Sequence, residues 1–171
     1  RQYIMSFQPI SLTTLDFNPF QRIGRDWMLI TAGDDAGVNT MTASWGGAGT
    51  LWGEDVVTVY IRPSRYTHQF VEAQGRFSLC FFDEAWRAQL SMLGRVSGRD
   101  RDKIADAGLH VTWLDGIPVF EQARQVLLVQ TLYADTLRAD CFTDRALLDK
   151  CYPQRDLHTV YVGKVLGAYE Q

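Results

Sequence analysis

The sequence predicts a mainly β protein, with an antiparallel barrel that carries helical insertions. Several apolar, β-branched and aromatic segments are separated by turn-rich joins, as is usual for antiparallel strands. Helical patterns interrupt these segments instead of alternating with them, which argues against a doubly wound sheet. No G-x-G-x-x-G motif follows a strand, so a Rossmann dinucleotide site is not supported. A closed antiparallel barrel with helical inserts fits these observations best.

The predicted strands are rich in the residues that suit a pleated, half-buried surface. They cover residues 27–32, 38–44, 56–61, 77–82, 111–114, 125–133 and 159–166. The turn cluster at 33–37 joins the first two strands into a hairpin, and Pro63 ends the third. Apolar residues on both faces of 77–82 predict a strand that is buried on both sides. The segment Gly116-Ile117-Pro118 breaks the chain after the fifth strand.

The predicted helices lie between these strands and have recognisable end signals. They cover residues 66–74, 83–94, 100–107 and 146–150. Ser64 is a candidate N-cap for the first helix, which should stop at Gly75. Asp83 can cap the second helix, which we expect to stop at Gly94.

Length and composition fit one domain over residues 1–171 with a core of its own. Hydrophobic residues make up 46% of the chain and charged residues 22%, as in ordinary soluble proteins. A net charge of -3 without a basic stripe gives no reason to expect nucleic acid. No apolar run is long enough to span a membrane. Because the first residues also lack a hydrophobic signal core, the expected location is the cytoplasm.

The residue types that bind metals are few and scattered. They are Cys80, Cys141, Cys151, His68, His110 and His158. The cysteines are odd in number and form no C-x-x-C pair, and no histidine has a second ligand at a suitable spacing. We therefore expect neither a disulfide framework nor a metal site, and Cys80 is most simply a small core residue.

The run Arg62-Pro63-Ser64-Arg65-Tyr66-Thr67 places two arginines and two hydroxyls around a proline turn, directly before a helical pattern. A phosphate monoester needs such fixed positive charge, several donors, and the free amides of a helix start. The alternative is a surface turn whose arginines pair with nearby acids such as Glu72. Because strand neighbours alternate faces, Arg62 and Arg65 can point in opposite directions, which would leave one of them structural.

The run Asn39-Thr40-Met41-Thr42-Ala43-Ser44-Trp45-Gly46-Gly47 ends a predicted strand in small hydroxylated residues, a Trp and paired glycines. Such an end lets a flat ring lie against bare backbone, whose amides can reach the polar edge of the ring. Together with the arginine turn, it suggests one ligand with a planar polar head and a phosphate tail. Flavin mononucleotide (FMN) fits that description. The alternative is that Trp45, like Trp52, packs at a barrel mouth or at a dimer contact.

The order of these motifs resembles the flavin reductase-like, FMN-binding split-barrel family, which includes flavoredoxin-type proteins. The resemblance runs from about Asn18 to the end of the chain. Besides the two runs above, it rests on Trp27-Met28-Leu29-Ile30-Thr31-Ala32-Gly33, Ser97-Gly98-Arg99-Asp100-Arg101-Asp102-Lys103 and Asp156-Leu157-His158-Thr159-Val160-Tyr161-Val162-Gly163. It implies an antiparallel split β-barrel, with residues 1–17 as an N-terminal extension. It also implies a homodimer with FMN near the subunit interface.

The resemblance further implies which residues hold the cofactor. These are Met41, Thr42, Ala43, Ser44, Trp45, Arg62, Ser64, Arg65, Tyr66, Thr67, Ser97, Gly98 and Lys103. The last three stand in a segment that is also typical of a solvated charge run. His158 is implied to lie close to the flavin as the candidate titratable group, although a lone His is more often structural. Lys164 stands where relatives commonly have an acid, which leaves the recognition of nicotinamide or a partner at that rim open.

Three hypotheses for function follow. The first is an NAD(P)H-dependent flavin reductase that passes electrons from NADH or NADPH through bound FMN to free flavin or a protein acceptor; this chemistry belongs to the cofactor and needs no catalytic dyad. The second is a flavoredoxin-type electron carrier that a redox protein partner reduces. The third is a non-redox barrel that binds a small ligand, or a dimeric interaction module, for which the aromatic residues would supply the lining.

Overall fold

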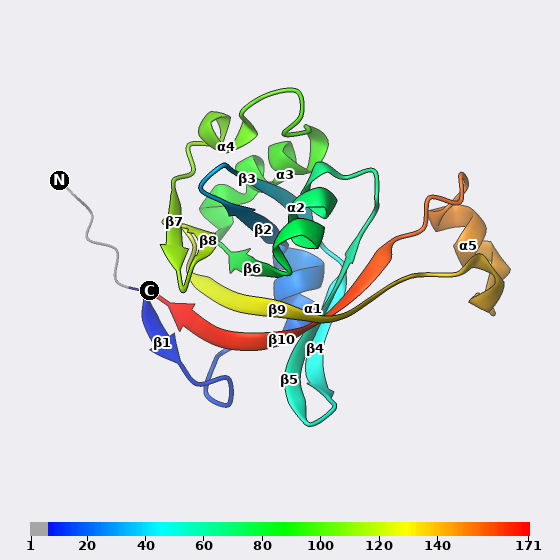
Figure 1. The fold of residues 1–171 in the computed structure, drawn as a ribbon, viewed down its shortest axis with the longest axis horizontal. Helices are drawn as coiled ribbons and strands as arrows, with labels where there is room; N and C mark the ends of the chain where they lie inside the picture. Colours follow the sequence, from blue (N-terminus) through cyan, green and yellow to red (C-terminus); the bar gives the residue numbers. More distant parts are fainter. Residues whose placement is uncertain (1–6) are drawn as a thin grey trace.

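The computed structural model describes residues 7–171, which form a curled antiparallel sheet with helices around it (Figure 1). The strands of this sheet are β1 (Gln8–Ile10), β2 (Met28–Asp34), β3 (Gly37–Ala43), β4 (Gly46–Leu51), β5 (Glu54–Ile61), β6 (Arg76–Phe81), β9 (Gln125–Thr136) and β10 (Thr159–Glu170). A separate hairpin joins β7 (Val111–Leu114) to β8 (Ile117–Phe120). The prediction of a mainly β, antiparallel fold is confirmed.

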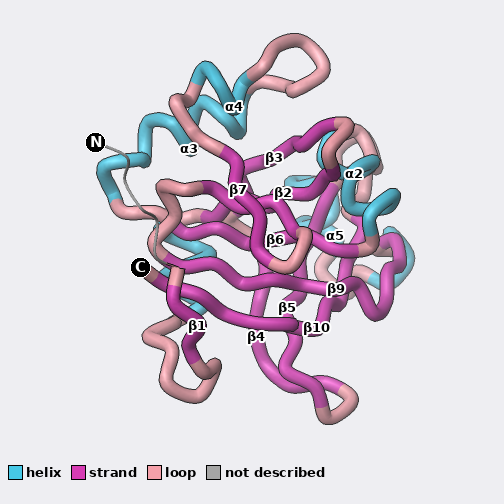
Figure 2. The backbone as a smooth tube through the Cα atoms, turned by 60° about the vertical axis from the view of Figure 1, so that its left-hand side comes forward, coloured by secondary structure: helices cyan, strands magenta, loops and turns pink. Residues whose placement is uncertain are grey.

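The sheet is split at the corner between β3 and β4. These strands stand at opposite ends of the order β3-β2-β6-β9-β10-β5-β4, yet only Ser44 and Trp45 separate them in the chain. The sheet must therefore curl until its two edges meet, and Figure 2 shows the strands curving around a common interior. No ladder joins β3 to β4 within residues 7–171, so the closed barrel expected from the strand pattern alone is not formed. The split barrel is what the sheet order produces.

Two apolar clusters hold the sheet on its two faces. The inner cluster includes Met28, Ile30, Val57, Val59, Phe77, Leu79, Val129 and Tyr161. The outer cluster includes Leu29, Cys80, Leu90, Leu93, Val119, Val126 and Leu128. Successive residues of β6 alternate between the two clusters, because side chains along a strand point to opposite faces. The predictions of a strand buried on both sides and of a core Cys80 are confirmed.

The helical segments lie mostly in the connections. They are α1 (Pro19–Gln21), a π-helical turn (Arg22–Asp26), α2 (Tyr66–Gln74), a 3₁₀ turn (Glu84–Trp86), α3 (Arg87–Arg95), α4 (Lys103–Asp106), a second 3₁₀ turn (Ala139–Cys141) and α5 (Arg145–Cys151). Helix α2 has the predicted bounds and stops at Gly75, whose φ of 65° is left-handed.

Predicted ends are wrong in three helices. The N-cap position of α2 is Arg65 and not Ser64, and no side chain caps the first amides. Helix α3 continues through Gly94 to Arg95, and the side chain of Asp83 makes no cap hydrogen bond. Helix α4 begins only at Lys103, because Asp102 caps it by accepting from the amide of Ala105.

The prediction also missed three strands, β1, β4 and β8. The sequence of β4 has weak β-propensity, and its pairing with β5 is what forms it. At the predicted break, Asp115 and Gly116 have φ values of 49° and 76° and make a tight hairpin turn. Pro118 then lies in β8, opposite Trp113.

The described part of the predicted N-terminal extension is built into the fold. Strand β1 pairs with β10, and Leu12, Leu15 and Phe17 pack against the inner cluster. Residues 1–6 of that extension lie outside the described residues. Over residues 7–171, no helix has both the length and the apolar character that crossing a bilayer requires.

Residues 137–158, called the arm below, connect β9 to β10 and carry α5. Figure 1 shows the arm extending away from the sheet. The chain returns from it through Asp156 and His158 into the start of β10. The arm thus delivers these two side chains to the region where β3 ends and α2 begins.

Candidate functional site

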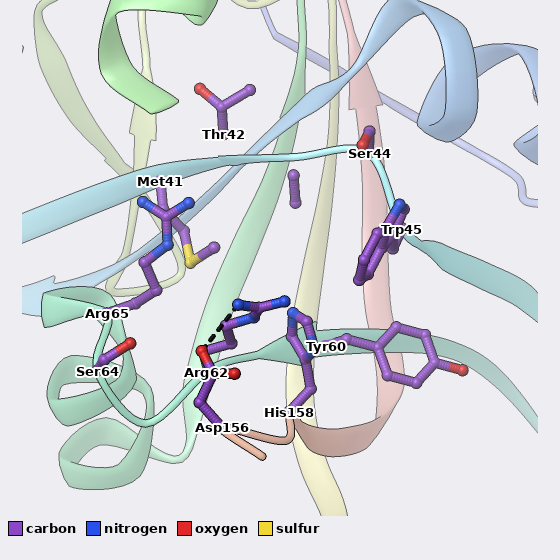
Figure 3. Close-up of a pocket in the computed structure, with 11 residues that line it drawn as sticks. Met41, Thr42, Ser44, Trp45, Tyr60, Arg62, Ser64, Arg65, Asp156 and His158 are labelled. Atoms are coloured by element: carbon purple, nitrogen blue, oxygen red, sulfur yellow. Dashed lines mark hydrogen bonds and ion pairs between the residues drawn. The ribbon is translucent and has the colours of Figure 1, made fainter. Parts of the chain in front are cut away.

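Two adjoining cavities lie beside the corner of the split sheet. The larger, of about 390 Å³, is lined by Met41, Thr42, Ala43, Ser44, Trp45, Tyr60, Arg62, Ser64, Arg65, Asp156 and His158 (Figure 3). The smaller, of about 180 Å³, is lined by Asn39, Met41, Ser64, Arg65, Tyr66, Thr67, Arg95, Val96, Ser97, Gly98, Arg99 and Lys103. Because Met41, Ser64 and Arg65 line both, the two cavities form one site with a wide and a narrow part.

One wall of the larger cavity is the end of β3. Within residues 7–171 this strand is at the edge of the sheet and pairs only with β2, so its other side has no strand to pair with. The hydroxyl of Thr42 points away from Arg62 and His158 and donates to the carbonyl of Leu90 at 2.5 Å (Figure 3). Thr42 therefore fastens α3 to the strand, and the backbone of β3 is what can meet a ligand. Trp45 is 48% exposed at the end of this wall.

Arg62 faces the arm. Its Nη1 donates to Asp156 Oδ2 at 2.8 Å and its Nη2 to the carbonyl of Cys151 at 2.9 Å. The guanidinium also lies 5.2 Å from the centre of the Tyr152 ring. The sequence alternative had an arginine pairing with Glu72, but Glu72 accepts from Tyr161 instead. Arg62 is thus held as the cation that ties the arm to the barrel.

The narrow cavity is strongly basic. Its lining includes Arg65, Arg95, Arg99 and Lys103 and contains no Asp or Glu. The side chain of Arg65 makes a single hydrogen bond, to the carbonyl of Gly94 at 3.3 Å, so most of its donors remain free within the described chain. Arg99 donates to the carbonyl of Ser64 at 3.0 Å and lies over the ring of Tyr66. Such a cluster of unpaired cations favours an anionic ligand.

The start of α2 adds backbone donors to the same cavity. The amides of Tyr66 and Thr67 have no acceptor among residues 7–171, because the helix lacks a side-chain cap. Unpaired amides at a helix start carry partial positive charge and bind anions. The uncapped N-terminus of α2 and the arginines therefore both favour an anionic ligand.

Lys103 is buried at the end of α3. Its Nζ donates to the carbonyls of Leu93 at 3.0 Å and Val96 at 3.1 Å. Burial, with a smaller contribution from the charge of Arg65, lowers the pKa of Lys103 to about 8. Lys103 therefore binds the C-terminus of α3 while it lines the narrow cavity.

The turn at Ser97 and Gly98 closes the narrow cavity. Ser97 Oγ accepts from the amide of Arg99 at 3.1 Å. A side chain at Gly98 would overlap the amide group of Asn39, which in turn donates to Thr67 at 2.8 Å. Glycine is needed here because the turn passes directly over Asn39.

His158 stands between the arm and Trp45. Its Nδ1 is 2.6 Å from the hydroxyl of Tyr152, and the centre of its ring is 5.2 Å from that of Trp45. Burial first, and then the charges of Arg62 and Arg65, lower the pKa of His158 to about 4. The imidazole is therefore neutral near pH 7.

Every predicted cofactor-binding residue, and His158, lines one cavity or the other. The sequence missed further lining residues, namely Asn39, Tyr60, Arg95, Val96, Arg99 and Asp156. Asp156 and Arg99 do stand within the quoted motifs, so their proximity to predicted residues was the available signal. Lys164 lines neither cavity and pairs with Glu54 at 3.0 Å.

A split β-barrel with a basic pocket beside a wider cavity, one wall of which is a strand edge, defines a protein that is suited to a phosphate-bearing ring compound. A family model described as a flavin reductase-like domain matches residues 20–171. The chain belongs to this family, and the resemblance stated from the sequence is confirmed. A search of curated protein sequences finds no match.

Solved structures share the fold. Flavoredoxin from Methanosarcina acetivorans has 20% identity and a TM-score of 0.66, over 85% of this chain and 68% of that one. An FMN-binding protein from Thermus thermophilus, with bound p-hydroxybenzaldehyde, has 22% identity and a TM-score of 0.67, over 96% and 81%. An NADH:FAD oxidoreductase from Streptomyces globisporus has 15% identity and a TM-score of 0.63, over 85% and 75%. At these identities the likeness shows the fold alone.

Proposed function

We propose that this protein is an FMN-dependent oxidoreductase that takes electrons from NADH or NADPH and passes them to free flavin or a protein acceptor. The observation that carries the proposal is the two-part site: a basic cavity without acids opens into a wider cavity beside an unpaired strand edge. A phosphate and a flat polar ring need these two environments side by side. Membership of the flavin reductase-like family supports the same ligand.

The narrow cavity fits the phosphate. Arg65 has free donors, Arg99 and Arg95 add charge, and the first amides of α2 are unpaired. Hydrogen bonds to an ionised partner contribute about 1.5–3 kcal/mol each, so a few of them are enough to retain the ligand. Lys103, although held by carbonyls, adds its positive charge below its lowered pKa.

The wider cavity fits the ring. Its volume of about 390 Å³ lies within the usual range for small-ligand sites. The unpaired edge of β3 and the side chain of Ser44 offer polar groups, and Trp45 offers an aromatic surface. Bound FMN would supply the hydride-accepting, electron-carrying ring. The protein then needs only to bind and orient it, which agrees with the absence of a catalytic dyad from the cavity lining of the described chain.

The test is to mix purified protein with excess FMN, to desalt it, and to record its absorption spectrum. We expect retained flavin bands, followed by anaerobic bleaching on addition of NADH or NADPH. Retained flavin that bleaches with dithionite but not with either nucleotide would favour the flavoredoxin-type carrier and a protein donor. A colourless protein with no measurable FMN affinity would overturn the proposal in favour of a non-redox ligand.

We also propose that the protein is a homodimer with FMN near the subunit interface. Several large apolar side chains are exposed beside the site or at the far end of β4, among them Phe20 at 79%, Trp45 at 48% and Trp52 at 60%. Exposed apolar surface along an unpaired edge strand is typical of an interaction site. Light scattering after size exclusion should give twice the chain mass, and Trp52→Glu should shift the protein toward the monomer.

A further inference from the structure

Tyr152, which the sequence did not single out, contacts His158 from outside the larger cavity. It follows the last turn of α5 and is 5% exposed. Its hydroxyl is 2.6 Å from Nδ1 of His158, and the two rings pack edge to face with centres 5.4 Å apart. Arg62 lies over the same tyrosine ring. Tyr152 does not itself line the cavity.

The buried hydroxyl decides which nitrogen of His158 carries the proton. Nδ1 is the single hydrogen-bond acceptor of the Tyr152 hydroxyl within the described chain. If Nδ1 carried a proton, the hydroxyl oxygen of Tyr152 would have to accept a hydrogen bond from it. The hydrogen of the Tyr152 hydroxyl would then be left without an acceptor. A buried donor without an acceptor is costly. Tyr152 therefore donates, Nδ1 accepts, and a neutral His158 carries its proton on Nε2.

The other ring nitrogen of His158, Nε2, is accessible from the cavity. Nε2 makes no hydrogen bond among residues 7–171, and it is not among their buried side-chain atoms that lack a partner. Since His158 lines the larger cavity, Nε2 is reachable from that space. The ring of Trp45 lies beside the imidazole, with the two ring centres 5.2 Å apart. Figure 3 shows His158 beside Arg62, facing the end of β3.

We propose that Tyr152 fixes His158 in the tautomer with the proton on Nε2, and that His158 uses this N–H as a hydrogen-bond donor to the ring of the ligand. The acceptor is a carbonyl oxygen or an unprotonated ring nitrogen. His158 contacts the ligand, whereas Tyr152 is a positioning residue. The assignment of the ligand as FMN rests on the proposed function, but the assignment of the tautomer does not.

A neutral, fixed donor suits a ring whose charge changes. An N–H that is already oriented stabilises negative charge on the acceptor atom without any rearrangement. Because the pKa of His158 is lowered to about 4, the imidazole stays neutral between pH 6 and 8, and its charge does not change while Nε2–H acts as the donor. The same residue would therefore favour the reduced form of a bound flavin over the oxidised form.

The first experiment uses the ligand-free protein. Long-range ¹⁵N–¹H NMR of the His158 ring should show an unprotonated Nδ1 and a protonated Nε2. In Tyr152→Phe, which keeps the aromatic ring, the signals should move toward a mixture of tautomers. Tyr133→Phe is the matched control, because the Tyr133 hydroxyl bonds Asp135 on an exposed strand. A protonated Nδ1 in the wild type, or an unchanged spectrum in Tyr152→Phe, would overturn the proposal.

The second experiment separates the two ring nitrogens in binding. The amide nitrogen of Gln falls near the position of Nε2, and that of Asn near the position of Nδ1. We expect His158→Gln to keep the FMN Kd within about threefold, and His158→Asn to raise it about tenfold, the loss expected for one hydrogen bond. Equal losses in both variants would overturn the donor role of Nε2. Absence of FMN binding by the wild type would refute the proposed function, while the NMR result would still decide the tautomer.

Discussion

Arg62 and Asp156 form an ion pair with an Nη1–Oδ2 distance of 2.8 Å, across 94 positions of sequence. The same guanidinium bonds the carbonyl of Cys151, so it joins the end of β5 to the arm at two points. Arg65, three residues later, makes one long hydrogen bond. Two arginines that look equivalent in the sequence thus differ in how many of their donors the protein itself uses. We infer that Arg62 chiefly stabilises the arm and Arg65 chiefly binds the ligand.

Replacement of Arg62 by Met should destabilise the protein. The change removes two charge-assisted hydrogen bonds and the contact with the Tyr152 ring, but the ion pair is partly exposed. We therefore expect a loss of about 1–2 kcal/mol in the free energy of unfolding, measured by urea denaturation. A double-mutant cycle with Asp156→Asn should show a coupling free energy between the two residues that accounts for part of this loss. Additive effects of the two changes would show that the ion pair does not stabilise the arm.

Replacement of Arg65 by Ala should weaken FMN binding by about tenfold or more, because one charged hydrogen bond is worth roughly 1.5–3 kcal/mol. The free energy of unfolding should change little, since Arg65 makes one hydrogen bond of 3.3 Å within the protein. Fluorescence titration of FMN measures the Kd. Arg145→Ala is the control, because the Arg145 side chain donates to the carbonyl of Ala139 within the arm. An unchanged Kd in Arg65→Ala would refute the phosphate assignment.

Local sequence predicted the strands that carry a strong local signal. Strand β5 is rich in β-branched residues, β6 has Phe77, Leu79 and Phe81 at alternate positions, and Gly75 marks the end of α2. The glycines of β4 carry no such signal, because only the neighbouring β5 makes them a strand. The predicted site residues came together because two short runs, at the end of β3 and the start of α2, supply most of the lining.

The roles of individual cations were not predictable from local sequence. The partner of Arg62 is set by where the arm returns to the barrel, and nothing near Arg62 encodes that contact. Lys103 stands in an alternating charge run that is typical of a solvated surface, yet α4 turns it inward to the carbonyls that end α3. Such contacts depend on tertiary packing, which motif spacing does not report.

Lys103 should make ligand affinity depend on pH. Its pKa of about 8 means that the ammonium loses its proton near the upper end of the physiological range. A phosphate is already dianionic there, since its second pKa is about 6. FMN affinity should therefore fall as pH rises from 7 to 9, and Lys103→Met should show weaker binding at pH 7 with a flatter profile. Titrations at several pH values measure this, and an identical slope in the variant would contradict it.

Lys103 should also make the stability of the folded protein depend on pH, but stability should rise with pH where ligand affinity falls. The pKa of Lys103 in the folded protein lies below its usual value of 10.5, so the unfolded chain binds more protons between about pH 8 and 10.5. The contribution of this lysine therefore makes the ligand-free protein more stable as pH rises through that window. Lys103→Met should lack this rise when urea unfolding is compared at pH 8 and pH 10. A rise of equal size in both proteins would mean that another group causes it.

His158 should make the protein less stable in acid. Its pKa falls from 6.5 to about 4 on folding, so the unfolded chain binds a proton over that interval while the folded protein does not. Stability should then decrease as pH falls from 6.5 to 4, by on the order of 3 kcal/mol at about 1.4 kcal/mol per pKa unit. His158→Gln should show a correspondingly smaller decrease in urea unfolding at pH 7, 5.5 and 4.5. His110→Gln, at an exposed histidine, should behave like the wild type. If His158→Gln instead kept the full acid loss, another group would cause it, and folding would not lower the pKa of His158.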